Sequence, residues 1–107
     1  MLESRKNEDI LEEELIDIEE YSKVDKKVPK GKKYKIRIDK VKYTVSESEM
    51  TGKQLLELAG KNPVEEYAIY QKLKGGKTVR IELNDIADFT SPGVERFVTL
   101  PLDQTEG

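Results

Sequence analysis

The sequence predicts one small α+β domain in which a mixed sheet carries a single short helix across one face. Alternating apolar and polar residues predict two strands before residue 46 and three more after residue 65. A capped, leucine-rich segment between them predicts the helix. Because a hairpin followed by a helix that crosses to a further strand gives both parallel and antiparallel neighbours, we expect a mixed sheet.

The composition excludes several classes of protein. The chain of 107 residues has no cysteine and no histidine, which excludes a disulfide framework, a cysteine nucleophile, the usual catalytic triads and most zinc sites. The acidic residues show no ligand spacing, so neither a metal nor a cofactor is expected. No apolar run approaches the roughly 18 residues that span a bilayer. We therefore expect a cytoplasmic protein that is not an enzyme and on which other proteins act.

An acidic arm begins the chain. The first 22 residues carry nine acidic and two basic side chains, whereas the next 20 carry ten basic and two acidic ones. Leu11, Leu15 and Ile18 follow helical spacing, which predicts a short amphipathic helix over about residues 8–22. A helix of this length is marginal by itself, so the arm is expected to be partly disordered or helical.

A lysine-rich stretch with Pro29 and Gly31 follows the arm and predicts a flexible linker. This change in composition divides the chain into three parts. Residues 1–32 form the acidic arm and linker, residues 33–101 form the compact domain, and residues 102–107 form a flexible tail with almost nothing to bury.

The compact domain begins with a predicted hairpin, residues 34–38 and 41–45, around a two-residue turn. A two-residue loop fixes the register and places every apolar residue of the hairpin on one face. The resulting pairs are Ile38 with Val41, Ile36 with Tyr43, and Tyr34 with Val45. The opposite face is mostly basic and consists of Lys35, Arg37, Lys42 and Thr44.

The helix has the clearest local signal. Thr51 and Gln54 form a capping box, in which the hydroxyl and the amide each satisfy a backbone N–H that would otherwise lack a partner. Gly60 suits the left-handed residue that ends a helix, and Pro63 prevents its continuation. These residues predict a short, well-bounded helix.

Three further strands follow, separated by turn signals. They are Glu66–Leu73, Thr78–Leu83 and Glu95–Leu100. Residues 74–77 contain a glycine pair and predict a hairpin turn. Residues 84–93 predict a loop with one helical turn, in which Ile86 and Phe89 tuck under the sheet.

This order of elements resembles the β-grasp fold of ubiquitin, and in particular the bacterial multiubiquitin domain family. The resemblance covers roughly residues 33–107. Three blocks carry it: Tyr34–Asp39, Thr51–Gly60 and Val94–Phe97. The chain departs from the family in having a single domain, and from ubiquitin in ending in one glycine and in carrying Asp103 where the ubiquitin tail has an arginine.

The resemblance implies a bacterial ubiquitin-like protein modifier. Such modifiers are activated at a C-terminal glycine by an ATP-dependent adenylating enzyme and are conjugated to target proteins, here through Gly107. The implied partners are this activating enzyme, a conjugating-type protein, a deconjugating metalloprotease and the target, and the family also suggests a role in phage defence. The departures in the tail imply a dedicated activating enzyme. The tail that this enzyme would recognise consists of Leu102, Asp103, Gln104, Thr105 and Glu106.

Two other functions stay open. A sulfur carrier uses the same fold and a terminal glycine as a thiocarboxylate donor, although such carriers usually end in a glycine pair and lack long arms. A non-conjugated, self-assembling scaffold would make no use of the tail. Nucleic-acid binding is not expected, because the lysines are accompanied by no recognition motif.

The arm itself carries a candidate strand-addition motif. It consists of Leu15, Ile16 and Ile18, which are followed by acidic residues in the stretch LIDIEE. Such a segment could pair with the exposed edge of residues 41–45, in its own chain or in a neighbouring one. That pairing would cap the edge or drive self-association. The alternative is a loosely helical, mostly disordered arm.

Overall fold

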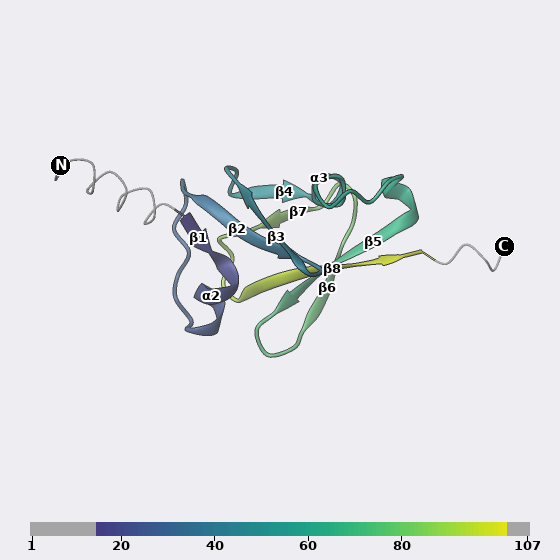
Figure 1. Cartoon of the computed structure of the whole chain (residues 1–107). Coiled ribbons are helices and arrows are strands. Elements are labelled where there is room, and N and C mark those ends of the chain that lie inside the picture. Colours follow the sequence, from purple (N-terminus) through teal and green to yellow (C-terminus); the bar gives the residue numbers. More distant parts are fainter. Residues whose placement is uncertain (1–14, 103–107) are drawn as a thin grey trace.

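The computed structural model describes residues 15–102, and Figure 1 labels most of their elements. The strands are β1 (Leu15–Asp17), β2 (Lys33–Ile38), β3 (Val41–Val45), β4 (Glu49–Thr51), β5 (Tyr67–Leu73), β6 (Thr78–Ile81), β7 (Ile86–Asp88) and β8 (Val94–Pro101). The helices are α2 (Ile18–Lys23), α3 (Gly52–Leu58) and the 3₁₀ turn η1 (Val64–Glu66).

The main sheet is mixed, as the sequence predicts. Strands β2 and β8 are parallel neighbours, paired at Ile38 and Phe97. Strand β3 is antiparallel to β2, and β5 is antiparallel to both β8 and β6. Together with β1, these strands form one six-stranded sheet, and α3 is the short helix that packs with it. The arrangement agrees with the ubiquitin-like β-grasp that the resemblance implies.

The predicted hairpin register is confirmed residue by residue. Tyr34 faces Val45, Ile36 faces Tyr43, and Ile38 faces Val41. Burial follows the predicted face for most of these side chains, but Val41 remains 52% exposed. Val41 follows the turn directly, at the end of the sheet edge, and so lies outside the core.

The predicted capping box of α3 is also confirmed. The Thr51 hydroxyl accepts from the Gln54 N–H at 3.1 Å, and the Gln54 side chain accepts from the Thr51 N–H at 2.9 Å. Beyond the helix, Gly60 adopts φ +74°, the left-handed conformation expected at the end of a helix.

The segment after β6 differs from its prediction. Residues 86–88 form strand β7, antiparallel to β4, so the predicted loop with a helical turn is wrong at this point. Phe89 is fully buried as predicted, but Ile86 is 57% exposed. Successive side chains of a strand point to opposite sides, and β7 turns Ala87 inward in place of Ile86.

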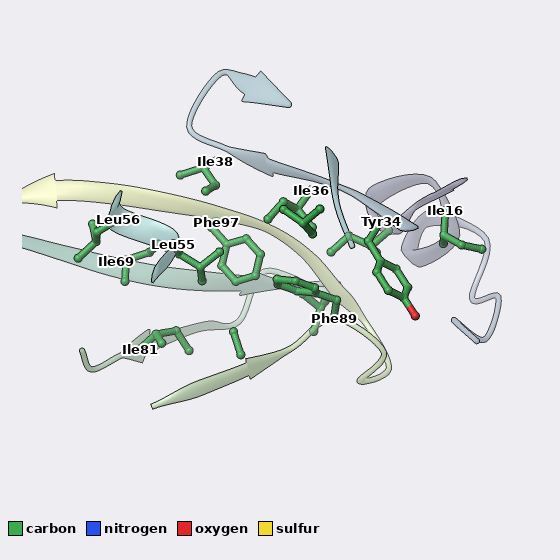
Figure 2. Packing of buried hydrophobic residues seen from close by; sticks show 14 of the residues in the cluster. Ile16, Tyr34, Ile36, Ile38, Leu55, Leu56, Ile69, Ile81, Phe89 and Phe97 are labelled. Atoms are coloured by element: carbon green, nitrogen blue, oxygen red, sulfur yellow. The ribbon is translucent and has the colours of Figure 1, made fainter. Parts of the chain in front are cut away.

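The core lies between the main sheet, α3 and the small β4–β7 sheet. Figure 2 shows Phe89 between Tyr34 and Phe97, with ring centroids 6.2 and 6.0 Å apart respectively. Leu55 and Leu56 of α3 are fully buried in the same cluster. Ile16 of β1 lies at the edge of this cluster, so part of the N-terminal arm belongs to the core.

Candidate functional site

The C-terminal end of β8 is the point at which the chain leaves the sheet. It lies at the opposite end of the molecule from β1 (Figure 1). The Leu102 N–H donates to the Glu66 carbonyl oxygen at 2.8 Å, and Pro101 is paired with Tyr67 of β5. The backbone is therefore held against β5 and η1 as far as Leu102.

The predicted tail divides at this point. Leu102 is half-buried and hydrogen-bonded. The other tail residues and the predicted conjugation site lie outside the described residues. They are Asp103, Gln104, Thr105, Glu106 and Gly107.

A side-chain clamp joins the β2–β3 turn to the end of β8. Asp39 has φ +57° in this turn, and its carboxylate accepts from the Thr99 N–H at 2.8 Å and from the Thr99 hydroxyl at 2.7 Å. The Asp39 N–H donates in turn to the Phe97 carbonyl oxygen at 2.8 Å. The turn thus fixes β8 shortly before the chain leaves the sheet.

Sequence reasoning missed this clamp, because it identified Asp39 only as a turn residue. The signal was the aspartate itself, whose short side chain tolerates positive φ and accepts hydrogen bonds from nearby backbone groups. Its partner is 60 residues away in the chain. No local pattern indicates that pairing.

Lys61 extends the clamp toward β5. Its Nζ lies 4.0 Å from the Asp39 carboxylate and 5.8 Å from the centre of the Tyr67 ring. Tyr67 is the residue paired with Pro101. A cation, an aromatic ring and a carboxylate therefore lie next to one another beside the end of β8.

An apolar strip on the sheet ends near the same point. Tyr70 and Val98 face each other across β5 and β8, and the next pair toward the tail on the same face of the sheet is Ala68 with Leu100. Leu100 is 54% exposed and Tyr70 and Val98 are half-buried, so this strip is open to a partner.

The N-terminal arm forms a second notable feature. Leu15, Ile16 and Asp17 pair in parallel with residues 33–35 of β2. The sequence hypothesis placed strand addition on residues 41–45, and the structure places it on the edge of β2 that lies opposite β3. Because β3 pairs with residues 34–38 along one edge of β2, β1 and β8 share the opposite edge. The helix predicted over residues 8–22 is replaced, within the described residues, by this strand and by α2.

The apolar residues of this segment are core residues. Ile16 is 2% exposed and Ile18 is 1% exposed, while Leu15 is half-buried. Asp17, between the two isoleucines, faces the opposite side and caps α2 by accepting from the Glu19 N–H at 3.1 Å. The alternation of apolar and acidic residues thus gives this segment of the arm one side that is buried in the core and one side that is charged.

Two ion pairs hold the charged side. Lys42 Nζ lies 2.6 Å from an Asp17 carboxylate oxygen, and an Arg37 guanidinium nitrogen lies 3.0 Å from the Glu19 carboxylate. Burial raises the pKa of the Asp17 carboxyl, but the hydrogen bond and charge of Lys42 together with two backbone N–H groups outweigh burial and hold that pKa below its ordinary value. The hydrogen bond that the Lys42 ammonium donates to Asp17 raises the pKa of Lys42.

Within residues 15–102, no group of three or more acidic side chains is arranged to hold a metal ion. No helix in the described residues is long and apolar enough to cross a membrane.

Comparison with known proteins identifies the family. The model of the family described as multiubiquitin matches residues 34–101. No curated protein and no solved structure matches the chain at a significant level. The matched residues are those from the start of the hairpin to the end of β8, with α3 and the small sheet between them, and they make up more than half of the chain. The chain therefore belongs to the multiubiquitin domain family.

Proposed function

We propose that this chain is a bacterial ubiquitin-like protein modifier that is activated at Gly107 and attached to target proteins. The observation that carries the proposal is the anchored end of β8, which Asp39 holds at Thr99 and Glu66 holds at Leu102. Because the end of β8 is anchored, a partner enzyme can bind the folded domain and act on the residues that follow Leu102. Membership of the multiubiquitin family supports this division of roles.

The chemistry requires a reachable carboxylate. In the activation step, a Gly107 carboxylate oxygen attacks the α-phosphate of ATP, and pyrophosphate leaves. In the transfer steps, nucleophiles attack the acyl carbon, AMP leaves, and an acceptor on the target finally holds the glycine. Glycine has no Cβ, so its carbonyl carbon is open to each successive nucleophile. The chain supplies the acyl group, and its partners supply the catalysis.

The partners follow from this division. They are a dedicated adenylating enzyme, a conjugating-type protein, a metalloprotease that removes the modifier, and the target. The exposed strip of Tyr70, Val98 and Leu100 lies beside the exit and offers apolar contact area for the first two.

The test is the intact mass of the chain after incubation with ATP and a candidate adenylating enzyme and conjugating-type protein. We expect a covalent adduct with a target protein that disappears when Gly107 is deleted. Val24→Ala, at a residue that is 68% exposed, serves as the matched control and should leave the adduct unchanged.

Two results would contradict the proposal. A mass gain equal to the replacement of one oxygen by sulfur would identify a sulfur carrier. An unchanged mass with every family adenylating enzyme tested would favour a scaffold that is not conjugated.

A further inference from the structure

The linker between α2 and β2 is exposed along most of its length. Residues 24–32 contain no buried side chain, and only Val28 and Lys32 are half-buried. Nine residues of extended chain span roughly 30 Å, which is more than the thickness of a small sheet layer. The linker therefore has enough reach to carry the arm away from its own domain.

The hydrogen bonds of the linker fall into two separate groups. Val24, Asp25 and Lys26 donate their backbone N–H groups back to α2. On the other side, the Tyr34 hydroxyl donates to the Pro29 carbonyl oxygen at 2.7 Å and accepts from the Lys32 N–H at 3.2 Å.

Between these groups, Lys27 and Val28 take part in no hydrogen bond with residues 15–102. A cleft of about 310 Å³ lies under this part of the linker. Its lining consists of Ser22, Asp25, Lys26, Lys27, Val28, Thr90, Pro92 and Gly93. Lys27 and Val28 thus form a hinge without hydrogen bonds, in which the Val28 side chain packs against the core cluster. One flank of the hinge is bonded to α2 and, through Asp25, to Lys74, and the other flank is bonded to Tyr34.

The contacts that seat the arm do not involve the hinge. Ile16 and Ile18 enter the core, and β1 pairs with residues 33–35 of β2. On the charged side, Asp17 contacts Lys42 and Glu19 contacts Arg37. Every one of these contacts joins residues 15–19 to residues beyond 32, and would be the same if the two parts came from different chains. We call the part of β2 that receives β1 the acceptor edge (residues 33–35).

We propose that two copies of this chain exchange their N-terminal arms, so that residues 15–26 of each copy sit on the acceptor edge of the other. Exchange keeps the buried isoleucines, the strand pairing and both ion pairs, and the path of the chain changes within the linker (residues 24–32), around Lys27 and Val28. The occupant is a second copy of the chain, because an alternation of isoleucine and acidic residues matched to Lys42 and Arg37 is present in the chain itself. This inference does not depend on conjugation.

The closed and exchanged forms differ mainly in effective concentration. A short flexible linker presents the arm to its own acceptor edge at an effective concentration on the order of 1 mM. Exchange is therefore expected to compete when the chain itself approaches roughly this concentration, and to be slow because the arm must first leave the core.

The test uses the absence of native cysteine from the chain. Leu15 and Lys33 are opposed residues of neighbouring strands, and such positions lie within reach of a disulfide. Full-length Leu15→Cys and Lys33→Cys chains are mixed near ~1 mM, under mild urea to allow exchange, and then diluted and oxidised. We expect a disulfide-linked heterodimer whose yield rises with concentration. The matched control replaces Lys33→Cys with Glu57→Cys, on the exposed side of α3, and should give only collisional cross-links.

Two outcomes would overturn the proposal. The first is a heterodimer yield that does not exceed the Glu57→Cys control at any concentration. The second is a yield that is unchanged when Ile16→Asp is added to the Leu15→Cys chain, because seating on the acceptor edge requires Ile16 in the core. Sedimentation velocity of the unmodified chain near ~1 mM gives an independent readout, and we expect it to show a dimer. When the Leu15→Cys chain is added, we expect mixed dimers that contain one chain of each kind.

Discussion

Ile16 is a residue of the arm that behaves as a residue of the core, at 2% exposure. We expect Ile16→Ala to lower the free energy of unfolding by about 2–5 kcal/mol, because it removes buried methyl groups and leaves a cavity. Urea denaturation measures this change. Val24→Ala, in the exposed linker, is the control and should change stability by less than about 0.5 kcal/mol. Equal effects of the two changes would mean that the arm is not seated in the core.

Asp17 gives the seated arm a pH dependence. Its folded pKa is lowered, so its contribution to stability is complete above the ordinary aspartate pKa of about 3.9 and is lost as the pH falls through the lower folded value. We expect Asp17→Asn to reduce stability by about 1 kcal/mol or less at pH 7, since the partner Lys42 is partly exposed.

This difference between the wild type and Asp17→Asn should shrink in acid below the folded pKa. Chemical denaturation of both proteins at neutral and strongly acid pH provides the measurement. Glu47→Gln, at an exposed acid, is the matched control. A difference that stays constant across this pH range would contradict the assigned ion pair.

Asp39 controls the end of β8. We expect Asp39→Ala to release Thr99, because the carboxylate that accepts two hydrogen bonds from Thr99 is lost, at a cost of about 1.5–3 kcal/mol for bonds to a charged group. Amide hydrogen exchange at Thr99 should become faster. Asp85→Ala removes a similar carboxylate, which accepts from the Glu82 N–H at 2.9 Å, and should leave Thr99 exchange unchanged. Equal exchange rates at Thr99 in the wild type and in Asp39→Ala would show that Asp39 does not hold the end of β8.

At the scale of elements, α3 shows why one glycine is required. The Gly52 N–H donates to the Asp85 carbonyl oxygen at 3.0 Å, and a Cβ at Gly52 would overlap the Glu82 carbonyl oxygen. The start of α3 therefore packs directly against the backbone of the loop after β6. The capping box predicts where the helix starts, and this contact explains why its first residue, directly after the Thr51 cap, is a glycine.

We expect Gly52→Ala to lower the free energy of unfolding by about 1–3 kcal/mol, because the backbone of Glu82 must move to admit the methyl group. Thermal or urea denaturation measures the loss. Lys53→Ala, at the next and exposed position of α3, should change stability by less than about 0.5 kcal/mol. A Gly52→Ala protein as stable as Lys53→Ala would show that the helix does not approach the loop so closely.

Elements with a local signal were predictable from the sequence. The β2–β3 register follows from a two-residue turn between alternating runs, and α3 follows from Thr51, Gln54 and Gly60. The small β4–β7 sheet was not predictable, because each strand has three residues and its partner lies far along the chain. The choice of edge for β1 was likewise not predictable, since the free edges of β2 and of β3 both offer backbone groups to an alternating segment.

At the scale of the whole molecule, the two ends of the described chain have different roles. The arm completes the core at one end of the sheet, and β8 leaves the sheet at the other (Figure 1). An arm variant such as Ile16→Asp is thus expected to act on stability and exchange, while tail variants act on activation. The acyl-transfer role proposed for the tail rests on the family resemblance, whereas the clamp at the end of β8 could be found only from the structure.

We propose that the carboxylate of Gly107 becomes bonded to a target protein. Trypsin cuts after Arg96, and no lysine or arginine follows, so a conjugated target must carry the remnant Phe97–Gly107. Fragmentation of the branched peptide by mass spectrometry locates the bond. We expect a bond from the carbonyl carbon of Gly107 to a target side chain. A cross-link through any other residue of the chain, or an adduct that survives deletion of Gly107, would contradict it.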